Sequence, residues 1–415
     1  MSVDTPARIA ILGAGPIGLE TALYARFLGY DVDIYERGGV AENILSWGHV
    51  RMFTPFGQNR SRLGIAALTA QEVGGLPADG DLLTGREYLE RYLAPLSRSD
   101  LLDGNIHERT EVLAIGRKKQ WKGENVGTES RDNDDFQLLL RERNKSERTA
   151  TADVVVDCTG TYGNHNWVGR GGLPAPGEQS ARRRIEYCLP DVLGESRHRY
   201  AGRRVVVIGS GYSAATTVVA LAELAQQEPE TRVTWITRGP SEEPIPRIAG
   251  DRYPERVHLA SAANHVSEAK DARVSHWPET TIREIRWKKD AGVFKLKLGG
   301  RHAGKLEADR VIANVGYRPN LELFRELHVQ TCYASEGPMK LASALSAAGD
   351  VKPAPSLGPE TLLTPEPDFY VLGAKSYGRN SQFFLSTGFD QIRALFTILG
   401  DRPDLDLYST VGKLP

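Results

Sequence analysis

Two glycine-rich loops of the same type lie about half a chain apart, and they limit the fold more than any other feature of this sequence. The first is Gly13-Ala14-Gly15-Pro16-Ile17-Gly18, and the second is Gly209-Ser210-Gly211-Tyr212-Ser213-Ala214. Each follows a short apolar run, residues 8–12 or 203–208, of the kind found in buried parallel strands. A G-x-G-x-x-G loop between a strand and a helix is a dinucleotide-binding fingerprint. The two loops therefore predict two dinucleotide sites on one chain.

The glycines of the first loop have separate tasks. Gly13 turns the chain tightly, Gly15 lets the backbone approach a pyrophosphate, and Gly18 lets the following helix pack close to the strand. Pro16 and Ile17 begin that helix, whose N-terminal N–H groups and positive dipole end favour phosphates.

An acidic residue completes the first site. Residues 31–36 form a second strand that ends in Glu36, near the spacing expected for a carboxylate that binds ribose hydroxyls. Arg37 follows directly and is assigned to the same site. The alternative is a glycine turn of another α/β protein, with Glu36 as an ordinary surface acid.

The second loop has a different ending. Residues 231–237 form the strand after its helix, and this strand is followed by Arg238 instead of an acid. A carboxylate there would repel a 2′-phosphate, whereas arginine can bind it. We therefore predict NADPH as the ligand of the second loop. The alternative is that Arg238 is an ordinary surface arginine.

A repeated pattern follows each loop. Two antiparallel strands are predicted in each half, and then a strand that rejoins the parallel sheet. The matching ranges are 111–115, 136–140 and 152–160 in the first half, and 281–285, 293–298 and 308–316 in the second. Two copies of one module thus make up most of the chain. The polar segment 118–135 is predicted to be an exposed, mobile insertion.

Composition excludes several classes of function. The chain has 415 residues, which suffices for two or three domains, and its net charge of −1 gives no reason to expect nucleic acid or an anionic membrane as a partner. We see no apolar leader and no apolar run long enough to span a membrane. The three cysteines are widely separated and have no zinc-ligand spacing, so we expect no metal and a reducing cytoplasm.

Both loops, the paired strands and Gly316-Tyr317-Arg318-Pro319-Asn320 together resemble the two-dinucleotide-binding-domain flavoproteins. That superfamily includes thioredoxin-reductase-like enzymes, disulfide reductases, flavin monooxygenases and N-hydroxylases. The resemblance implies an α/β fold of two Rossmann-like, three-layer ββα domains, with FAD on the first and NADPH on the second. The NADPH domain, 200–308, is expected as an insertion between the two parts of the FAD domain, 1–199 and 309–415.

The resemblance also implies a set of cofactor-binding positions. The predicted FAD contacts are Gly13, Gly15, Pro16, Ile17, Gly18, Glu36, Arg37, Trp47, Arg51, Val112, Thr159, Gly160, Gly316, Gly373 and Gly388. The predicted NADPH contacts are Gly209, Gly211, Tyr212, Ser213, Ala214 and Arg238.

Two departures from the family pattern matter. Neither 212–215 nor 40–56 contains cysteine, and a dithiol relay needs two nearby thiols. Reduction through an internal disulfide is therefore not expected. The family's Gly-Asp near the C-terminus, whose Asp binds the ribityl chain of FAD, is replaced here by Gly373-Ala374-Lys375. The ribityl partner is thus left open.

Three segments are expected to meet at the flavin ring and to hold the candidate catalytic residues. The stretch 46–56 contributes Arg51, which could hold an anionic group of the flavin or substrate. It also contributes aromatic side chains that could stack on the flavin; the alternative is that they form a hydrophobic plug between domains. The stretch 159–167 contributes His165, which could hydrogen-bond NADPH or substrate. The alternative is that His165 has a structural role. The stretch 378–391 contributes Gln382, with hydrogen bonding inside its loop as the alternative.

Three functions remain after this reasoning. The first is a monooxygenase that uses NADPH, FAD and molecular oxygen to oxygenate a nitrogen, sulfur or carbonyl centre of a small molecule through a C4a-hydroperoxyflavin. The second is a reductase that passes electrons from the flavin directly to an external disulfide, quinone or protein. The third is a redox-sensing binding protein. Substrate identity stays open, and a homodimer is the default expectation.

Overall fold

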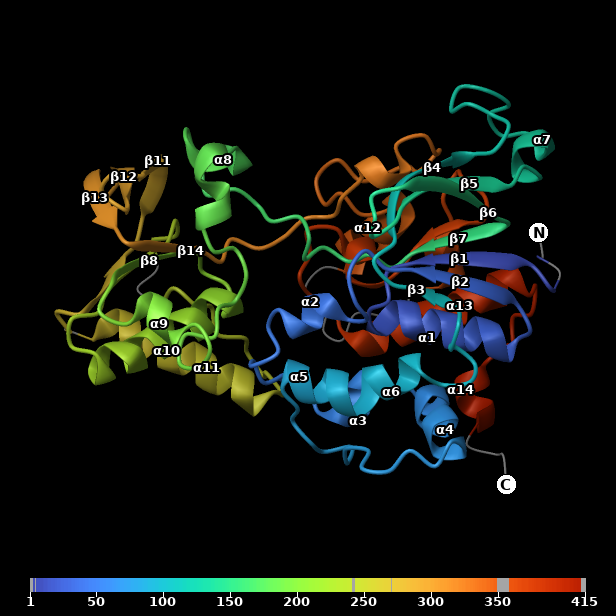
Figure 1. The fold of residues 1–415 in the computed structure, drawn as a ribbon, viewed down its shortest axis with the longest axis horizontal. Coiled ribbons are helices and arrows are strands. Elements are labelled where there is room, and N and C mark those ends of the chain that lie inside the picture. Colours follow the sequence, from blue (N-terminus) through green and yellow to red (C-terminus); the bar gives the residue numbers. More distant parts are fainter. Residues whose placement is uncertain (1–2, 4, 241–242, 270, 349–357, 412–415) are drawn as a thin grey trace. The chain divides into compact units, whose positions relative to one another are not determined.

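The computed structural model describes residues 3, 5–240, 243–269, 271–348 and 358–411, and the chain divides into two compact units (Figure 1). Unit 1 combines Met1–Asn164 with Arg318–Pro415, and unit 2 is the continuous stretch His165–Tyr317. The second unit is therefore an insertion in the sequence of the first. Within the described residues, no helix is both long and apolar enough to cross a membrane.

Unit 1 contains a five-stranded parallel sheet and a three-stranded antiparallel sheet. The parallel sheet has the order β15 (Phe369–Val371), β7 (Val154–Asp157), β1 (Arg8–Leu12), β2 (Asp31–Tyr35) and β3 (Ile106–His107). The antiparallel sheet has the order β4 (Glu111–Arg117), β5 (Phe136–Arg141) and β6 (Glu147–Ala152). The helices of this unit are α1 (Pro16–Phe27), α2 (Glu42–Leu45), α3 (Phe56–Asn59), α4 (Arg62–Ala70), α5 (Gly85–Tyr88), α6 (Ala94–Ser97), α7 (Glu129–Asp132), α12 (Met339–Ala348), α13 (Leu385–Leu399) and α14 (Leu407–Thr410).

Alternation along β1 explains why unit 1 has three layers. Ile9 and Ile11 belong to the core cluster that includes α1 and α13, whereas Ala10 and Leu12 belong to the cluster that includes β5. Successive side chains of a strand point to opposite faces of its sheet. The parallel sheet is therefore covered by helices on one face and by the antiparallel sheet on the other (Figure 1).

Unit 2 repeats this plan. Its parallel sheet has the order β10 (Val274–Trp277), β9 (Arg232–Ile236), β8 (Arg204–Ile208) and β14 (Arg310–Ala313). Its antiparallel sheet contains β11 (Thr280–Lys288), β12 (Val293–Gly300) and β13 (Gly304–Ala308), and its helices are α8 (Glu178–Ala181), α9 (Arg197–Tyr200), α10 (Tyr212–Gln227) and α11 (Pro254–Glu268). Val205 and Val207 pack toward α10 and α11, whereas Val206 and Ile208 pack toward β12. The predicted fold class is thus confirmed.

The two units share details that the sequence patterns did not reveal. Asp153 accepts hydrogen bonds from the backbone N–H and the guanidinium of Arg8, and Asp309 does the same for Arg204. Each aspartate lies between an antiparallel strand and a strand of the parallel sheet. The strands predicted at 152–160 and 308–316 correspond to β7 and β14, and the antiparallel strand before each of them, β6 or β13, was missed.

The boundary between the units differs from the predicted positions at 199/200 and 308/309. Residues 165–199 belong to unit 2, where a buried acid holds the segment together and a backbone hydrogen bond joins it to β11. Glu178 accepts hydrogen bonds from the backbone N–H groups of Val168 and Ala175 and from the hydroxyl of Tyr187. The carbonyl of Pro176 accepts the N–H of Ile285 in β11.

The insertion 118–135 is exposed only in part. The side chain of Trp121 is exposed, as predicted, but Arg131 is buried and pairs with Glu366 over 2.9 Å. Glu366 also pairs with Arg117 over 2.7 Å. The prediction of an exposed segment was wrong for Arg131. The polar composition of 118–135 does not reveal that Arg131 has a buried charge partner more than 200 residues away.

Candidate functional site

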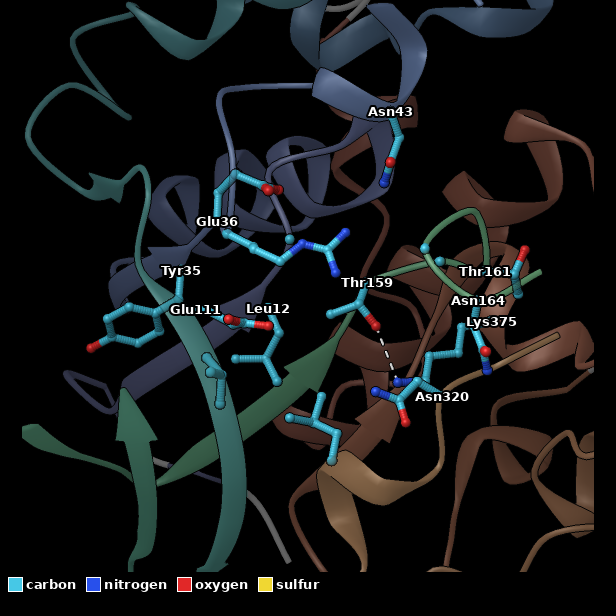
Figure 2. A pocket seen from close by; sticks show the side chains of 16 residues that line it. Leu12, Tyr35, Glu36, Asn43, Glu111, Thr159, Thr161, Asn164, Asn320 and Lys375 are labelled. Atoms are coloured by element: carbon cyan, nitrogen blue, oxygen red, sulfur yellow. Dashed lines mark hydrogen bonds between the residues drawn. The ribbon is translucent and has the colours of Figure 1, made fainter. Parts of the chain in front are cut away.

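A cavity of about 300 Å³ lies in unit 1 at the carboxyl ends of its parallel strands (Figure 2). Ligands of open α/β sheets bind at this edge because the loops that follow the strands meet there. The cavity is lined by Leu12, Gly13, Tyr35, Glu36, Arg37, Asn43, Glu111, Val112, Thr159, Gly160, Thr161, Gly163, Asn164, Asn320, Leu323 and Lys375. Six predicted cofactor residues, Gly13, Glu36, Arg37, Val112, Thr159 and Gly160, are thus brought together.

The first glycine loop leaves β1 and leads into α1. Gly13 has φ +93°, a backbone conformation that other residues rarely adopt. A Cβ on Gly18 would lie 1.9 Å from the carbonyl oxygen of Gly13, so only glycine lets α1 approach β1 this closely. Among the described residues, no atom beyond its chain neighbours would lie within 4 Å of a Cβ on Gly15. Protein packing therefore does not require glycine here, whereas a bound pyrophosphate would.

Glu36 forms another wall of the cavity and is held by backbone groups. Its Oε2 accepts the N–H of Ala14 over 2.9 Å, and its Oε1 accepts the N–H of Gly38 over 2.7 Å. The carboxylate therefore has a fixed position beside the glycine loop, where the ribose next to a bound pyrophosphate would lie. Arg37 lies beside Gly163, with a guanidinium nitrogen 3.1 Å from where a Cβ of that glycine would stand.

The opposite wall follows β7. Gly160 has φ +66° and faces open space, while Thr159 is tied to the strand end, because its N–H and its hydroxyl both donate to Asp157. Lys375 approaches from the turn after β15 and donates to the hydroxyl of Thr159 over 3.1 Å, the contact drawn in Figure 2. Its stronger contact is with Asp157, over 2.5 Å.

The C-terminal segment meets the first helix at Ile17. A Cβ on Gly388, in α13, would lie 2.2 Å from Ile17 Cδ1, and a Cβ on Gly373 would lie 3.3 Å from Ile17 Cγ1. The backbone N–H of Gly373 donates to Gln391 of α13 over 2.9 Å. Three predicted cofactor residues, Ile17, Gly373 and Gly388, are therefore neighbours through close packing.

FAD fits the residues of this cavity. The N-terminus of α1 carries no side-chain cap, so its first N–H groups remain for a phosphate. Gly15 and Gly160 each face open space where a side chain would take up room, and the Glu36 carboxylate is fixed beside them. This is the arrangement that a pyrophosphate with an adjoining ribose requires.

The second glycine loop lies in unit 2 between β8 and α10. Gly209 has φ +137°, and its Cβ would collide with the carbonyl of Asn314, whereas Gly211 faces open space. Tyr212, Ser213 and Ala214 form the first turn of α10, which also has no side-chain cap. Both loops therefore offer the same kind of uncapped helix end.

The end of β9 in unit 2 holds the residues next to Arg238. Arg238 is exposed and directly follows Thr237, whose hydroxyl is hydrogen-bonded to His276 Nε2 over 2.9 Å. Burial, with a smaller contribution from His302, lowers the pKa of His276 to about 4. His276 is therefore neutral at neutral pH, and Arg238 carries the positive charge at this strand end.

The remaining predicted residues lie outside the cavity lining. Arg51 is exposed and pairs through its backbone with Thr84, and Gln382 is exposed with its N–H bound to Asn380. Trp47 packs against Gly85.

The chain crosses between the units at His165. The ring of His165 stacks on Tyr187 with 3.5 Å between ring centroids and meets Trp167 edge-on. Gly316 accepts the N–H of Asn166 at the same crossover. His165 and Gly316 are thus placed in unit 2, next to its boundary.

Several cavity residues were missed as ligands from the sequence. Asn43, Asn164 and Asn320 supply amides, and Lys375 supplies a cation. From the sequence, these asparagines could not be distinguished from asparagines that serve only as turn residues in loops. Lys375 follows the end of β15 after Leu372, Gly373 and Ala374, and its burial became visible only in the structure.

None of the three cysteines provides an obvious redox pair. Cys158 is half-buried beside Thr21, and burial, helped by Asp157, raises the pKa of its thiol far above the ordinary value. Cys188 and Cys332 belong to different units, and all three thiols are free. Within the described residues, no group of histidine, cysteine, aspartate or glutamate is arranged to hold a metal ion.

A family model of the pyridine nucleotide-disulphide oxidoreductases matches residues 10–340. This match covers well over half of the chain, and the protein therefore belongs to that family. It is an oxidoreductase of the two-dinucleotide-binding-domain flavoprotein superfamily. No curated protein sequence matches the chain significantly.

Solved structures share the fold at low sequence identity. Bacillithiol disulfide reductase from Bacillus cereus is 18% identical with a TM-score of 0.68, over 95% of this chain and 99% of that chain. Thioredoxin reductase from T. acidophilum is 17% identical with a TM-score of 0.58, over 95% and 97%. The cadaverine monooxygenase of desferrioxamine biosynthesis from Erwinia amylovora is 15% identical with a TM-score of 0.61, over 96% and 95%. Reductases and monooxygenases are thus both among the similar structures.

Proposed function

We propose that this protein is an NADPH-dependent, FAD-containing monooxygenase that oxygenates a nitrogen, sulfur or carbonyl centre of a small molecule. The observation that carries the proposal is a complete set of two dinucleotide loops without a dithiol beside either of them. Electrons that reach the flavin must therefore leave it directly. Molecular oxygen is the acceptor that needs no further protein group.

The residues of the chain divide the binding work. The Gly13 loop and the N-terminus of α1 would hold the FAD pyrophosphate, and Glu36 would bind the adjoining ribose. The Gly209 loop and Arg238 would hold NADPH through its pyrophosphate and 2′-phosphate. The chemistry that FAD supplies when bound is the transfer of two electrons from NADPH to O₂, with one oxygen atom entering the substrate and the other leaving as water.

Arg51, His165 and Gln382 remain predicted contacts of the substrate or the nicotinamide. His165 has the most restricted side chain of the three, because Tyr187 and Trp167 pack against its ring. A functional His165 would act from a fixed orientation, with Nδ1 hydrogen-bonded to the carbonyl of Asn166 over 2.9 Å. Its replacement by alanine should then change the kinetics of NADPH oxidation more than its replacement by asparagine.

A second candidate is a reductase that passes electrons directly to an external disulfide. The fold similarity favours it in one respect, since the TM-score to the bacillithiol disulfide reductase exceeds that to the cadaverine monooxygenase. This candidate uses the same two cofactor sites. It differs only in what approaches the reduced flavin.

Oxygen consumption under NADPH separates the candidates. The purified FAD-loaded protein is mixed with NADPH and a panel of amines, sulfides and ketones under isotopically labelled oxygen gas. A monooxygenase gives a product with one labelled oxygen atom, and its oxygen uptake matches NADPH oxidation. Peroxide release without any oxygenated product would contradict the proposal, and anaerobic NADPH oxidation with a low-molecular-weight disulfide would support the reductase.

A further inference from the structure

An ion pair closes the base of the cavity in unit 1. Lys375 Nζ lies 2.5 Å from Asp157 Oδ2, and the two side chains are 1% and 0% exposed. Lys375 comes from the 3₁₀ turn Gly373–Tyr377, and Asp157 ends β7. A buried lysine is rare, and a buried ion pair stabilises a fold little, because taking both charges out of water is costly. Fold stability is therefore a weak reason for this pair.

The two members of the pair differ in access to the cavity. Lys375 is part of the lining, together with Gly13, Thr159 and Gly160, whereas Asp157 is not (Figure 2). Nζ also receives an orienting contact from Thr159, whose hydroxyl accepts one of its hydrogens over 3.1 Å. The ring of Phe324 lies 5.2 Å from the same nitrogen. Lys375 thus belongs to the cavity lining, while its cation is buried and held by Asp157, Thr159 and Phe324.

We propose that Lys375 binds the pyrophosphate of FAD. An ammonium has three hydrogens to donate, and Asp157 and Thr159 accept two of them. The pyrophosphate is the anionic part of FAD, and Gly13, the first residue of the glycine loop that would bind it, lines the same cavity. Charge complementarity therefore selects the pyrophosphate among the parts of FAD.

The proposal rests on FAD as the cofactor, but it does not depend on the final electron acceptor. A simpler role exists for Lys375 as the counter-ion of Asp157 alone. The two roles differ in how a change at Lys375 should affect ligands with and without phosphate groups. A pyrophosphate contact favours ligands with phosphates, whereas a counter-ion role affects all ligands of the site alike.

Competition with FAD at the apoprotein tests this difference. ADP and adenosine share the adenine and ribose, and only ADP carries the pyrophosphate. Each is titrated against FAD, with flavin fluorescence as the readout, on the wild type and on K375M, K375R, T159V and the double variant D157N/K375M. The double variant removes both charges, so it leaves no buried carboxylate unpaired. K118M is the matched control, because Lys118 is an exposed lysine of the same unit and is not in the cavity lining.

Lost hydrogen bonds to charged groups typically weaken binding roughly 10- to 100-fold. We expect the preference for ADP over adenosine to fall by about that factor in K375M and in D157N/K375M, and by less in T159V. K375R and K118M should keep most of the preference for ADP over adenosine. An unchanged preference in the double variant and in T159V would overturn the proposal and leave Lys375 as a counter-ion. Wild-type apoprotein that binds no FAD would instead contradict the proposed function.

Discussion

The carboxylate of Glu36 accepts the backbone N–H of Ala14, inside the first glycine loop, over 2.9 Å. Its second oxygen accepts the N–H of Gly38 over 2.7 Å. One side chain thus joins the end of β2 to the loop after β1. A carboxylate restrained in this way reaches a ribose without losing much rotamer entropy on binding.

Replacing Glu36 by alanine should weaken FAD binding by about 10- to 100-fold, because both the ribose contact and the restraint on Ala14 are lost. Glutamine should lose less, since its amide oxygen can still accept one N–H. The dissociation constant of FAD, measured by fluorescence quenching on apoprotein, checks this. Asp33→Ala is the matched control, because Asp33 lies on the same strand but pairs with His107 away from the cavity. If E36A and D33A bound FAD with equal affinity, Glu36 would not contribute to FAD binding.

Alanine at Gly15 and at Gly18 should have opposite effects. A Cβ at Gly15 meets no protein atom within 4 Å, so G15A apoprotein should unfold near the wild-type temperature but bind FAD poorly. A Cβ at Gly18 lies 1.9 Å from Gly13 O, so G18A should destabilise the apoprotein by about 1–3 kcal/mol or more. Thermal unfolding without FAD, followed by FAD titration, distinguishes the two. Strong destabilisation by G15A would show that protein packing, not a ligand, needs that glycine.

Arg238 should decide which nicotinamide cofactor is used. If it binds the 2′-phosphate, R238A should lower kcat/KM for NADPH by about 10- to 100-fold and leave kcat/KM for NADH nearly unchanged. Anaerobic flavin reduction in a stopped-flow instrument measures both values without involving oxygen. Arg232→Ala, at the other end of β9, is the control. A parallel loss with both cofactors would mean that Arg238 does not discriminate between them.

Glu20 should make stability depend on pH. Burial raises the pKa of its carboxyl to about 7, although contacts with Ser61 and Tyr408 oppose the shift. The folded protein therefore holds this proton at a pH where the unfolded chain has released it. The stabilisation is complete below about pH 4 and is lost as the pH rises through about 7, with a total near 3 kcal/mol.

Thermal unfolding of wild type and E20Q over this pH range isolates the contribution of Glu20. Glutamine cannot ionise, so the difference in unfolding free energy between the two proteins should change in favour of E20Q as the pH rises from 5 to 8. A difference that stays constant over the range would show that Glu20 has an ordinary pKa.

Sequence patterns predicted the parts of the site that local chemistry determines. The turn at Gly13, the close approach at Gly18 and the acid at the end of β2 each depend on residues within one β-α-β unit, and the fingerprint contains them all. The loop after β7 was also predicted, because a parallel strand ends where ligands bind. The repeat was visible for the same reason, since each module carries its own pattern.

What could not be predicted depends on partners far apart in the chain. Lys375 and Asp157 are 218 residues apart, and nothing near either residue in the sequence indicates the other. The strands before Asp153 and Asp309 were missed because their sequences, ERTATA and GKLEA, are largely polar, and the arginine partners of the two aspartates lie on other strands. The position of His165 beside Tyr187 depends on how residues 165–199 fold within unit 2.

The discontinuous first unit also sets an order of events during synthesis. β15 and Lys375 are translated after the whole of unit 2, and without them the sheet of unit 1 lacks its edge strand and the cavity lacks its cation. A chain leaving the ribosome thus has a complete second unit while the first is still unfinished. Unit 2, although later in the sequence than the first glycine loop, is therefore synthesised in full before the sheet that carries that loop is complete.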